Sequence, residues 1–174
     1  VGCGKVGSGV GNLLIKMGVR LFVSDLNQKI IRENLKPGYR ILEENAWPNF
    51  ACDMLVNCAF SKDLTLDIAH NLQCRAIISA ANVPFESKRV EDLLEERGIT
   101  CVKSYISNGG AVISDSVEKY FPEKFKRGYQ NHLFDFISDR IEQKTLEHLD
   151  GADSELQDSQ EEIVAGGLFN ERQF

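Results

Sequence analysis

A glycine-rich segment has the residue types and spacing of a phosphate-binding loop. Residues Gly2-Cys3-Gly4-Lys5-Val6-Gly7 match the pattern G-x-G-x-x-G. In this pattern the first glycine permits a tight turn, the second lets the backbone approach a pyrophosphate, and the third lets a helix pack closely on a strand. Apolar residues then recur at helical spacing from Val6 to Met17, so the positive N-terminus of a helix would face the phosphates. The same pattern also fits a strand–helix turn that binds nothing. Lys5 either pairs with the pyrophosphate or is simply exposed.

An acidic residue lies where a dinucleotide site needs one. The apolar run Val19 to Val23 predicts a strand, and Asp25 follows it, about 20 residues after Gly4. A carboxylate in this position accepts hydrogen bonds from the adenosine ribose hydroxyls, and it repels a 2′-phosphate. The sequence therefore predicts a site for NAD in preference to NADP.

Three further segments place small residues or amides at predicted strand ends. They are Cys58-Ala59, Ala81-Asn82 and Asn108-Gly109-Gly110. Ligands of doubly wound sheets lie at the carboxyl ends of strands, so these segments suit a nicotinamide and its ribose. Each asparagine also fits a turn or a helix cap.

The elements that must position these residues alternate between strand and helix. Strands are predicted at 19–23, 53–59, 76–81 and 99–105, with a weak one at 39–42, and helices at 6–17, 27–35, 66–72 and 88–97. Short loops between them predict an α/β fold with a doubly wound parallel sheet, a dinucleotide-binding domain of the Rossmann type over residues 1–122. We interpret its first strand as cut short at Val1.

A different pattern begins after Pro122. Phe125, Tyr129, Leu133, Phe136, Ile137 and Ile141 keep helical spacing, which predicts a helical extension over residues 123–174. We expect Phe125, Phe134 and Phe136 to cover an intramolecular surface or a neighbouring subunit. Gly151 is expected to break the helix, and a final weak helix and a loose end are expected beyond it.

Charge and cysteine usage narrow the function classes. The net charge is −6, and seven acids between Glu147 and Glu162 leave the remaining sequence near neutral, so no basic patch favours nucleic acid. No apolar run is long enough for a membrane helix. The five cysteines form no CxxC pair, and the histidines (His70, His132 and His148) lack ligand spacing, so we expect no metal site and a reducing, cytoplasmic location.

The ordered motifs resemble the cofactor-binding domain of the glutamate/leucine/phenylalanine/valine dehydrogenase family. The resemblance spans roughly residues 1–118 and rests on five segments: Gly2-Cys3-Gly4-Lys5-Val6, Asp25-Leu26-Asn27, Cys52 to Ala59, Ala81-Asn82-Val83-Pro84, and Asn108 to Ile113. The sequence departs from the family pattern where Asn57 replaces Pro and Phe60-Ser61 replaces Leu-Gly.

The resemblance implies roles for the candidate residues. Together with Gly2 and Gly7, the residues Gly4, Lys5 and Val6 would hold the pyrophosphate, and Asp25 and Leu26 would hold and flank the adenosine. Cys58 and Ala59 would line the site. Asn82 and Asn108 would position the nicotinamide ribose and carboxamide. The implied activity is reversible, NAD-dependent oxidative deamination of a branched-chain or aromatic L-amino acid to a 2-oxo acid.

The family's catalytic Gly-Gly-x-Lys segment is not found in the sequence. We therefore expect no catalytic residue here and expect this chain alone to be inactive. The amino-acid or 2-oxo-acid substrate would be met through a missing N-terminal domain, and a homo-oligomer is one arrangement that the resemblance allows. Two alternatives stay open, namely a nucleotide-sensing regulatory domain and a non-catalytic interaction domain.

Overall fold

The computed structural model describes residues 1–126 and 130–151. It divides into two compact units, of which the first comprises Val1–Tyr105 and the second begins at Ile106. The first unit has two buried apolar clusters and the second has one, and each unit is described by itself.

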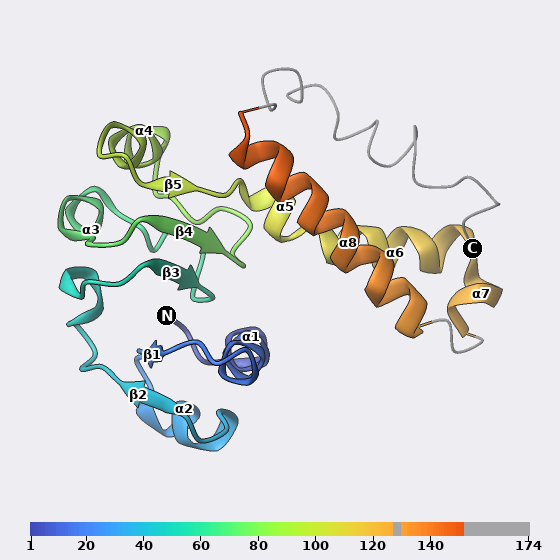
Figure 1. The fold of residues 1–174 in the computed structure, drawn as a ribbon, viewed down its shortest axis with the longest axis horizontal. Coiled ribbons are helices and arrows are strands. Elements are labelled where there is room, and N and C mark those ends of the chain that lie inside the picture. The colour runs from blue at the N-terminus through green and yellow to red at the C-terminus, as the bar shows by residue number, and fades with distance from the viewer. Residues whose placement is uncertain (127–129, 152–174) are drawn as a thin grey trace. The chain divides into compact units, whose positions relative to one another are not determined.

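The first unit contains two parallel sheets (Figure 1). Strand β1 (Leu21–Val23) pairs with β2 (Tyr39–Ile41), so that Phe22 lies opposite Arg40. Strands β3 (Met54–Asn57), β4 (Ala76–Ser79) and β5 (Thr100–Cys101) form the second sheet in that order, with Leu55 opposite Ile77. The predicted weak strand at 39–42 is therefore confirmed as β2.

The segment Val1–Gly2 joins the two sheets. The Val1 nitrogen donates to the Val56 carbonyl at 2.8 Å, and the Cys58 nitrogen donates to the Val1 carbonyl at 2.8 Å. On the other side, the Gly2 nitrogen donates to the Ser24 carbonyl at 2.9 Å. The spatial order is therefore β2, β1, Val1–Gly2, β3, β4, β5, which is the parallel order of a Rossmann-type α/β fold. The predicted fold class is confirmed.

A groove of about 310 Å³ runs between β1 and β3 beyond this junction. Its lining is largely apolar and includes Val10 and Leu14 from the first helix, Phe22 from β1, and Met54 and Val56 from β3. Among the described residues, β1 and β3 do not pair with each other.

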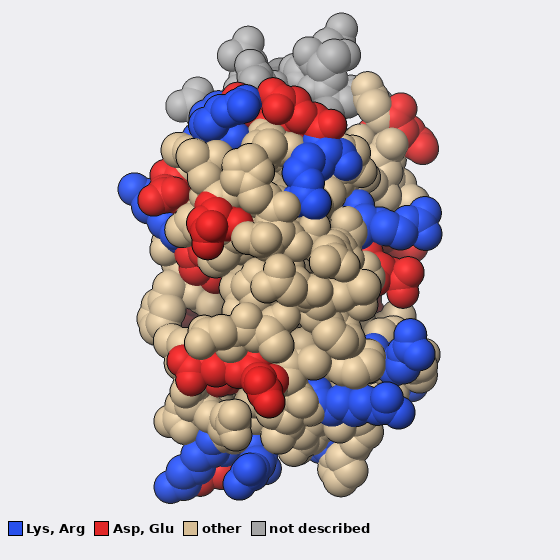
Figure 2. Space-filling view, turned by 90° about the vertical axis from the view of Figure 1, so that its left-hand side faces the viewer, with Lys and Arg blue, Asp and Glu red and all other residues tan. Residues whose placement is uncertain are grey.

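Helices connect the strands, as the periodicity predicts. Helix α1 (Lys5–Lys16) precedes β1, α2 (Gln28–Asn34) precedes β2, α3 (Leu66–Asn71) precedes β4, and α4 (Lys88–Glu96) precedes β5. A short 3-10 helix, η1 (Trp47–Asn49), lies before β3. On the face shown in Figure 2, acidic and basic side chains surround a centre of uncharged residues.

The core of the first unit lies mainly between β3–β5 and helices α3 and α4. Leu64, Ile77 and Leu94 are almost completely buried there, and Trp47 packs against this cluster. A smaller cluster around Val23 and Ile31 lies between β1 and α2. Burying a large aliphatic side chain contributes about 1.5–3 kcal/mol, so these two clusters hold the strand ends in place.

The last predicted strand is much shorter than expected. The sequence predicts a strand over 99–105, but β5 ends at Cys101 and a short helix, α5 (Ser104–Ser107), begins soon after. The Ser104 hydroxyl donates to the Asn82 carbonyl at 2.9 Å, and the Lys103 ammonium contacts Glu91 at 2.6 Å. These side-chain contacts draw the chain out of the extended conformation.

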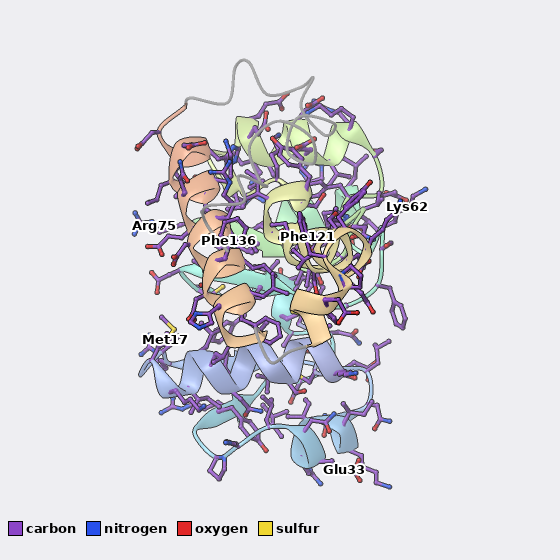
Figure 3. All side chains as sticks on the ribbon, turned by 90° about the vertical axis from the view of Figure 1, so that its right-hand side faces the viewer. Met17, Glu33, Lys62, Arg75, Phe121 and Phe136 are labelled. Atoms are coloured by element: carbon purple, nitrogen blue, oxygen red, sulfur yellow. The ribbon has the colours of Figure 1, made fainter. Side chains whose placement is uncertain are left out.

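The second unit is helical. It contains α6 (Gly109–Tyr120), α7 (Pro122–Lys126) and α8 (Gln130–Leu149), with Ile113, Val117, Leu133 and Ile137 as its buried cluster. Phe125 and Phe136 pack on this cluster, as predicted, and Figure 3 shows Phe136 on α8. Phe134 is 61 % exposed and does not belong to this cluster among the described residues.

Gly151 follows α8 with a positive φ of 76°, consistent with the predicted break. The expected final helix, and most of the acidic segment, lie outside the described residues. None of the helices described is both long and apolar enough to cross a membrane.

Candidate functional site

The glycine loop turns tightly at Gly2 and packs against the end of β3. Gly2 has φ of 80°, a conformation that residues with a Cβ rarely adopt. A Cβ at this position would lie 2.7 Å from the Ala59 nitrogen and from the Cys58 carbonyl. The candidate residues Gly2, Cys58 and Ala59 are therefore in direct contact.

The other two glycines of the motif differ in what surrounds them. A Cβ on Gly7 would overlap the Gly2 carbonyl oxygen and approach the Cys58 Cβ, so only glycine lets α1 pack this closely on the loop. A Cβ on Gly4 would meet nothing within 4 Å. Gly7 is thus required by packing, whereas Gly4 borders open space.

Helix α1 begins at this open space without a side-chain cap. Gly4 is the N-cap residue, no side chain hydrogen bonds there, and the first turn holds no acidic residue. Lys5 and Val6, the first helical residues, are exposed. The unpaired N–H groups of a helix N-terminus carry partial positive charge and can hold a phosphate group.

The Asp25 carboxylate faces the glycine loop. One oxygen accepts from the Cys3 nitrogen at 2.6 Å and the other from the Asn27 nitrogen at 2.8 Å. A carboxylate offers about four acceptor positions, so each oxygen can accept a further hydrogen bond. The structure thus joins Asp25, at the end of β1, to the loop that precedes α1, and Leu26 beside it is 73 % exposed.

The cysteines next to the loop are held as neutral thiols. Burial raises the pKa of the Cys3 thiol and of the Cys58 thiol. The thiolate is the nucleophilic form, so a raised pKa argues against covalent chemistry at these positions. Cys58 lies against Gly2 and Gly7, so its observed contacts are packing contacts.

The two asparagines predicted for the nicotinamide end have different surroundings. Asn82 follows β4 in the first unit and is exposed, and its carbonyl is held by Ser104. Asn108 precedes α6 as its N-cap residue and belongs to the second unit, where it lies between two helices. Our expectation of a loop directly after a strand is therefore wrong for Asn108, because the chain has already become helical at Ser104. The roles predicted for both residues stay predictions.

Sequence reasoning missed a hydrogen-bonded polar pair beside the candidate site, in which Asn57 is buried and Asp63 is half-buried. The Asn57 side chain is 1 % exposed, and its nitrogen donates to the Asp63 carboxylate at 2.8 Å. Its oxygen accepts from the Ala59 nitrogen at 3.0 Å. The available signal was an asparagine in place of the family's proline, with an acid six residues later, but nothing in the sequence shows that the two side chains meet.

The strand order and the connecting helices define a Rossmann-type α/β domain, and the comparisons identify the family. Residues 20–121 match the model of the family Glutamate/Leucine/Phenylalanine/Valine dehydrogenase. The chain belongs to this family and comprises a dehydrogenase domain, as the motifs predicted. The matched residues include Asp25, Cys58, Ala59, Asn82 and Asn108.

Curated relatives and solved structures agree with this assignment. A phenylalanine dehydrogenase of Lysinibacillus sphaericus is 30 % identical, with 71 % of this chain and 34 % of that protein covered. A phenylalanine dehydrogenase of Bacillus thermotolerans is 26 % identical, with 97 % and 46 % covered. The crystal structure of L-tryptophan dehydrogenase from Nostoc punctiforme matches with a TM-score of 0.62 at 24 % identity, covering 82 % of this chain and 51 % of that one, and supports the fold. The chain thus spans about a third to a half of the length of these curated relatives.

Proposed function

We propose that this chain is the NAD-binding domain of an L-amino-acid dehydrogenase that acts on a branched-chain or aromatic substrate. The observation that carries the proposal is the Asp25 carboxylate, which is bonded to the glycine loop ahead of an uncapped helix N-terminus. This arrangement offers acceptors for ribose hydroxyls next to donors for a pyrophosphate.

The residues present fit the cofactor. Gly4 leaves open space in front of α1, where a phosphate would approach the backbone nitrogens of Lys5 and Val6. Asp25 would accept from the adenosine ribose, and the exposed Leu26 offers an apolar surface to the adenine. Cys58 and Ala59 would bound the site beside Gly2. When bound, NAD supplies the acceptor for the hydride released from the amino acid.

In this proposal the chain binds the cofactor and does not supply the catalytic acid–base groups. They bind and orient a dinucleotide, but neither neutral thiol beside the loop is suited to move a proton. Catalytic acid–base groups and the amino-acid pocket would be supplied by a substrate domain, which agrees with the smaller length of this chain relative to its relatives.

Calorimetric titration of the chain with NAD and with NADP tests the proposal. We expect NAD to bind more tightly, because Asp25 repels a 2′-phosphate. The variant Asp25→Ser should weaken NAD binding by about tenfold and should reduce the preference over NADP. Glu33→Ala is the matched control, since this acid on α2 is exposed and pairs only with Lys29 among the described residues. Absence of NAD binding by the native chain would refute the proposal, and equal affinity for both cofactors would refute the role of Asp25.

A second measurement addresses the activity. A longer protein that contains this chain should form NADH in the presence of an aliphatic or aromatic L-amino acid. A nucleotide-sensing domain would bind NAD without supporting that reaction in any parent protein, so the assay separates the two classes.

A further inference from the structure

The pair formed by Asn57 and Asp63 lies where the first unit presents its candidate site. Asn57 is the last residue of β3, and Cys58 and Ala59 follow it directly. Its carbonyl accepts from the Ala80 nitrogen at 2.7 Å and from the Ser79 hydroxyl at 3.3 Å, which ties it to the end of β4. The sheet therefore fixes the backbone of Asn57. Its buried side chain takes no part in the sheet and hydrogen bonds to Asp63 and to the Ala59 nitrogen.

The chemistry of its neighbours determines how the Asn57 amide is oriented. The Asp63 carboxylate can only accept when ionised, and the Ala59 backbone nitrogen can only donate. The amide nitrogen must therefore face Asp63, at 2.8 Å, and the amide oxygen must face Ala59, at 3.0 Å. Asp63 thus reinforces the orientation in which Asn57 accepts from the Ala59 nitrogen.

Asp63 is itself held firmly on the loop that carries it. The neighbouring Lys62 adopts φ of 62° and donates its backbone nitrogen to the Val83 carbonyl at 2.6 Å. The Leu64 nitrogen donates to the Pro84 carbonyl at 3.1 Å. Figure 3 shows the Lys62 side chain pointing outward. The contacts that hold this loop are therefore its backbone hydrogen bonds and the hydrogen bond between Asp63 and Asn57. Half-burial raises the pKa of the Asp63 carboxyl, and the hydrogen bond from Asn57 opposes that rise.

The contact continues from Ala59 to the glycine loop. The Ala59 nitrogen lies against Gly2, at the position where a Cβ would approach to 2.7 Å. A displacement of Ala59 would therefore press on the turn at Gly2 or withdraw support from it. A continuous series of contacts leads from Asp63 through Asn57 and Ala59 to the loop proposed to hold the pyrophosphate.

We propose that Asp63 is a positioning residue for the dinucleotide site, because it orients the buried Asn57 amide and thereby fixes the Ala59 backbone against Gly2. The inference rests on the proposed function and adds a residue to it that does not touch the cofactor. It concerns a pair that departs from the family pattern, since Asn57 stands where proline is usual.

The test uses the full chain with Asp63→Ala, Asp63→Asn and the control Glu86→Ala, which removes an exposed acid from the neighbouring loop. NAD affinity is measured by calorimetry, and hydrogen exchange of the Ala59 amide is measured by NMR without NAD. We expect Asp63→Ala to weaken NAD binding by about tenfold and to speed Ala59 exchange by a similar factor, because the Asn57 amide loses its orienting acceptor. Asp63→Asn should keep the NAD affinity and the exchange rate of the Ala59 amide close to those of the native chain, since its side-chain oxygen can still accept from Asn57.

The outcomes separate this inference from the proposed function. If the native chain binds NAD and Asp63→Ala changes neither quantity, the positioning role is refuted while the proposed function stands. If the native chain binds no NAD, the proposed function fails, and Ala59 exchange alone decides whether Asp63 fixes the loop. Equal losses in Asp63→Asn and Asp63→Ala would also contradict the proposal, because the charge rather than the acceptor would then matter.

Discussion

Single residues beside the glycine loop are constrained by contacts that differ in kind. Asp25 is held by two backbone nitrogens, Asn57 is oriented by a carboxylate, and Cys3 is buried as a neutral thiol. Backbone donors and a charged acceptor fix side chains more strongly than solvent-exposed pairs do. The candidate site is therefore largely preformed within the first unit.

Thiol reactivity provides a test at the scale of the residue. Burial raises the pKa of Cys74 to about 11 and that of Cys101 to about 12, while Cys52 and Cys58 are only half-buried. We predict that a disulfide reagent at pH 8 labels Cys52 and Cys58 first. Cys74 and Cys101 should react only after unfolding, because both access and the thiolate fraction are low. Raising the pH to about 9.5 should speed labelling of the first pair, since the thiolate fraction increases with pH.

Mass spectrometry of the labelled peptides distinguishes the sites. Labelling of Cys101 in the folded chain at pH 8, at the rate found for Cys52, would contradict the prediction. Denatured chain serves as the control, because all the cysteines should then react alike.

At the scale of the element, helix α1 and its N-cap residue include glycines with opposite requirements. Gly7 has no room for a Cβ, whereas Gly4 and Gly9 have nothing within 4 Å. We predict that Gly7→Ala lowers stability by about 1–3 kcal/mol through overpacking against the Gly2 carbonyl. Gly9→Ala, in the same helix, should raise stability by about 0.5–1 kcal/mol because alanine favours the helix.

Gly4→Ala separates folding from binding. We expect it to leave the unfolding temperature nearly unchanged and to weaken NAD binding, since its methyl group would occupy the space in front of the helix. Thermal unfolding and calorimetry on the three variants check these outcomes. A large loss of stability in Gly4→Ala, or none in Gly7→Ala, would show that the loop packs differently.

Most elements could be predicted from the sequence, because apolar periodicity reflects which face of a helix or strand is buried. The end of β5 could not, because it depends on the Ser104 hydroxyl reaching the Asn82 carbonyl from a distant loop. The pair Asn57 and Asp63 is close in sequence, but it too depends on how the loop after β3 folds back, which no periodicity shows. Asp25 could be proposed from the sequence because its proposed role follows from its distance to the glycine motif along the chain. Local pattern thus predicts the elements, whereas contacts between loops need the folded structure.

At the scale of the whole molecule, the two units have separate apolar clusters. The single tryptophan of the sequence lies in the first unit, so its fluorescence reports on that unit. Trp47 packs on the cluster of the first unit that includes Leu94, whereas Ile137 belongs to the cluster of the second unit. We predict that Leu94→Ala destabilises the first unit by about 2–5 kcal/mol and shifts the tryptophan fluorescence transition in urea to lower concentration. Ile137→Ala should shift the helical circular dichroism signal while moving the fluorescence transition little.

Each variant is the control for the other. Identical shifts of both signals in both variants would show that the two clusters unfold as one cooperative unit. The comparison therefore measures whether separate cores give separate stability.

The junction at Val1–Gly2 has a mechanical consequence for the first unit. Among the described residues, three backbone hydrogen bonds cross this junction. One joins Gly2 to Ser24 after β1, and two join Val1 to Val56 and Cys58 at the end of β3. The groove beside it adds apolar lining but no strand pairing. Within residues 1–105, these backbone bonds at Val1 and Gly2 link the two sheets, so a load applied from β2 to β5 would act on them directly.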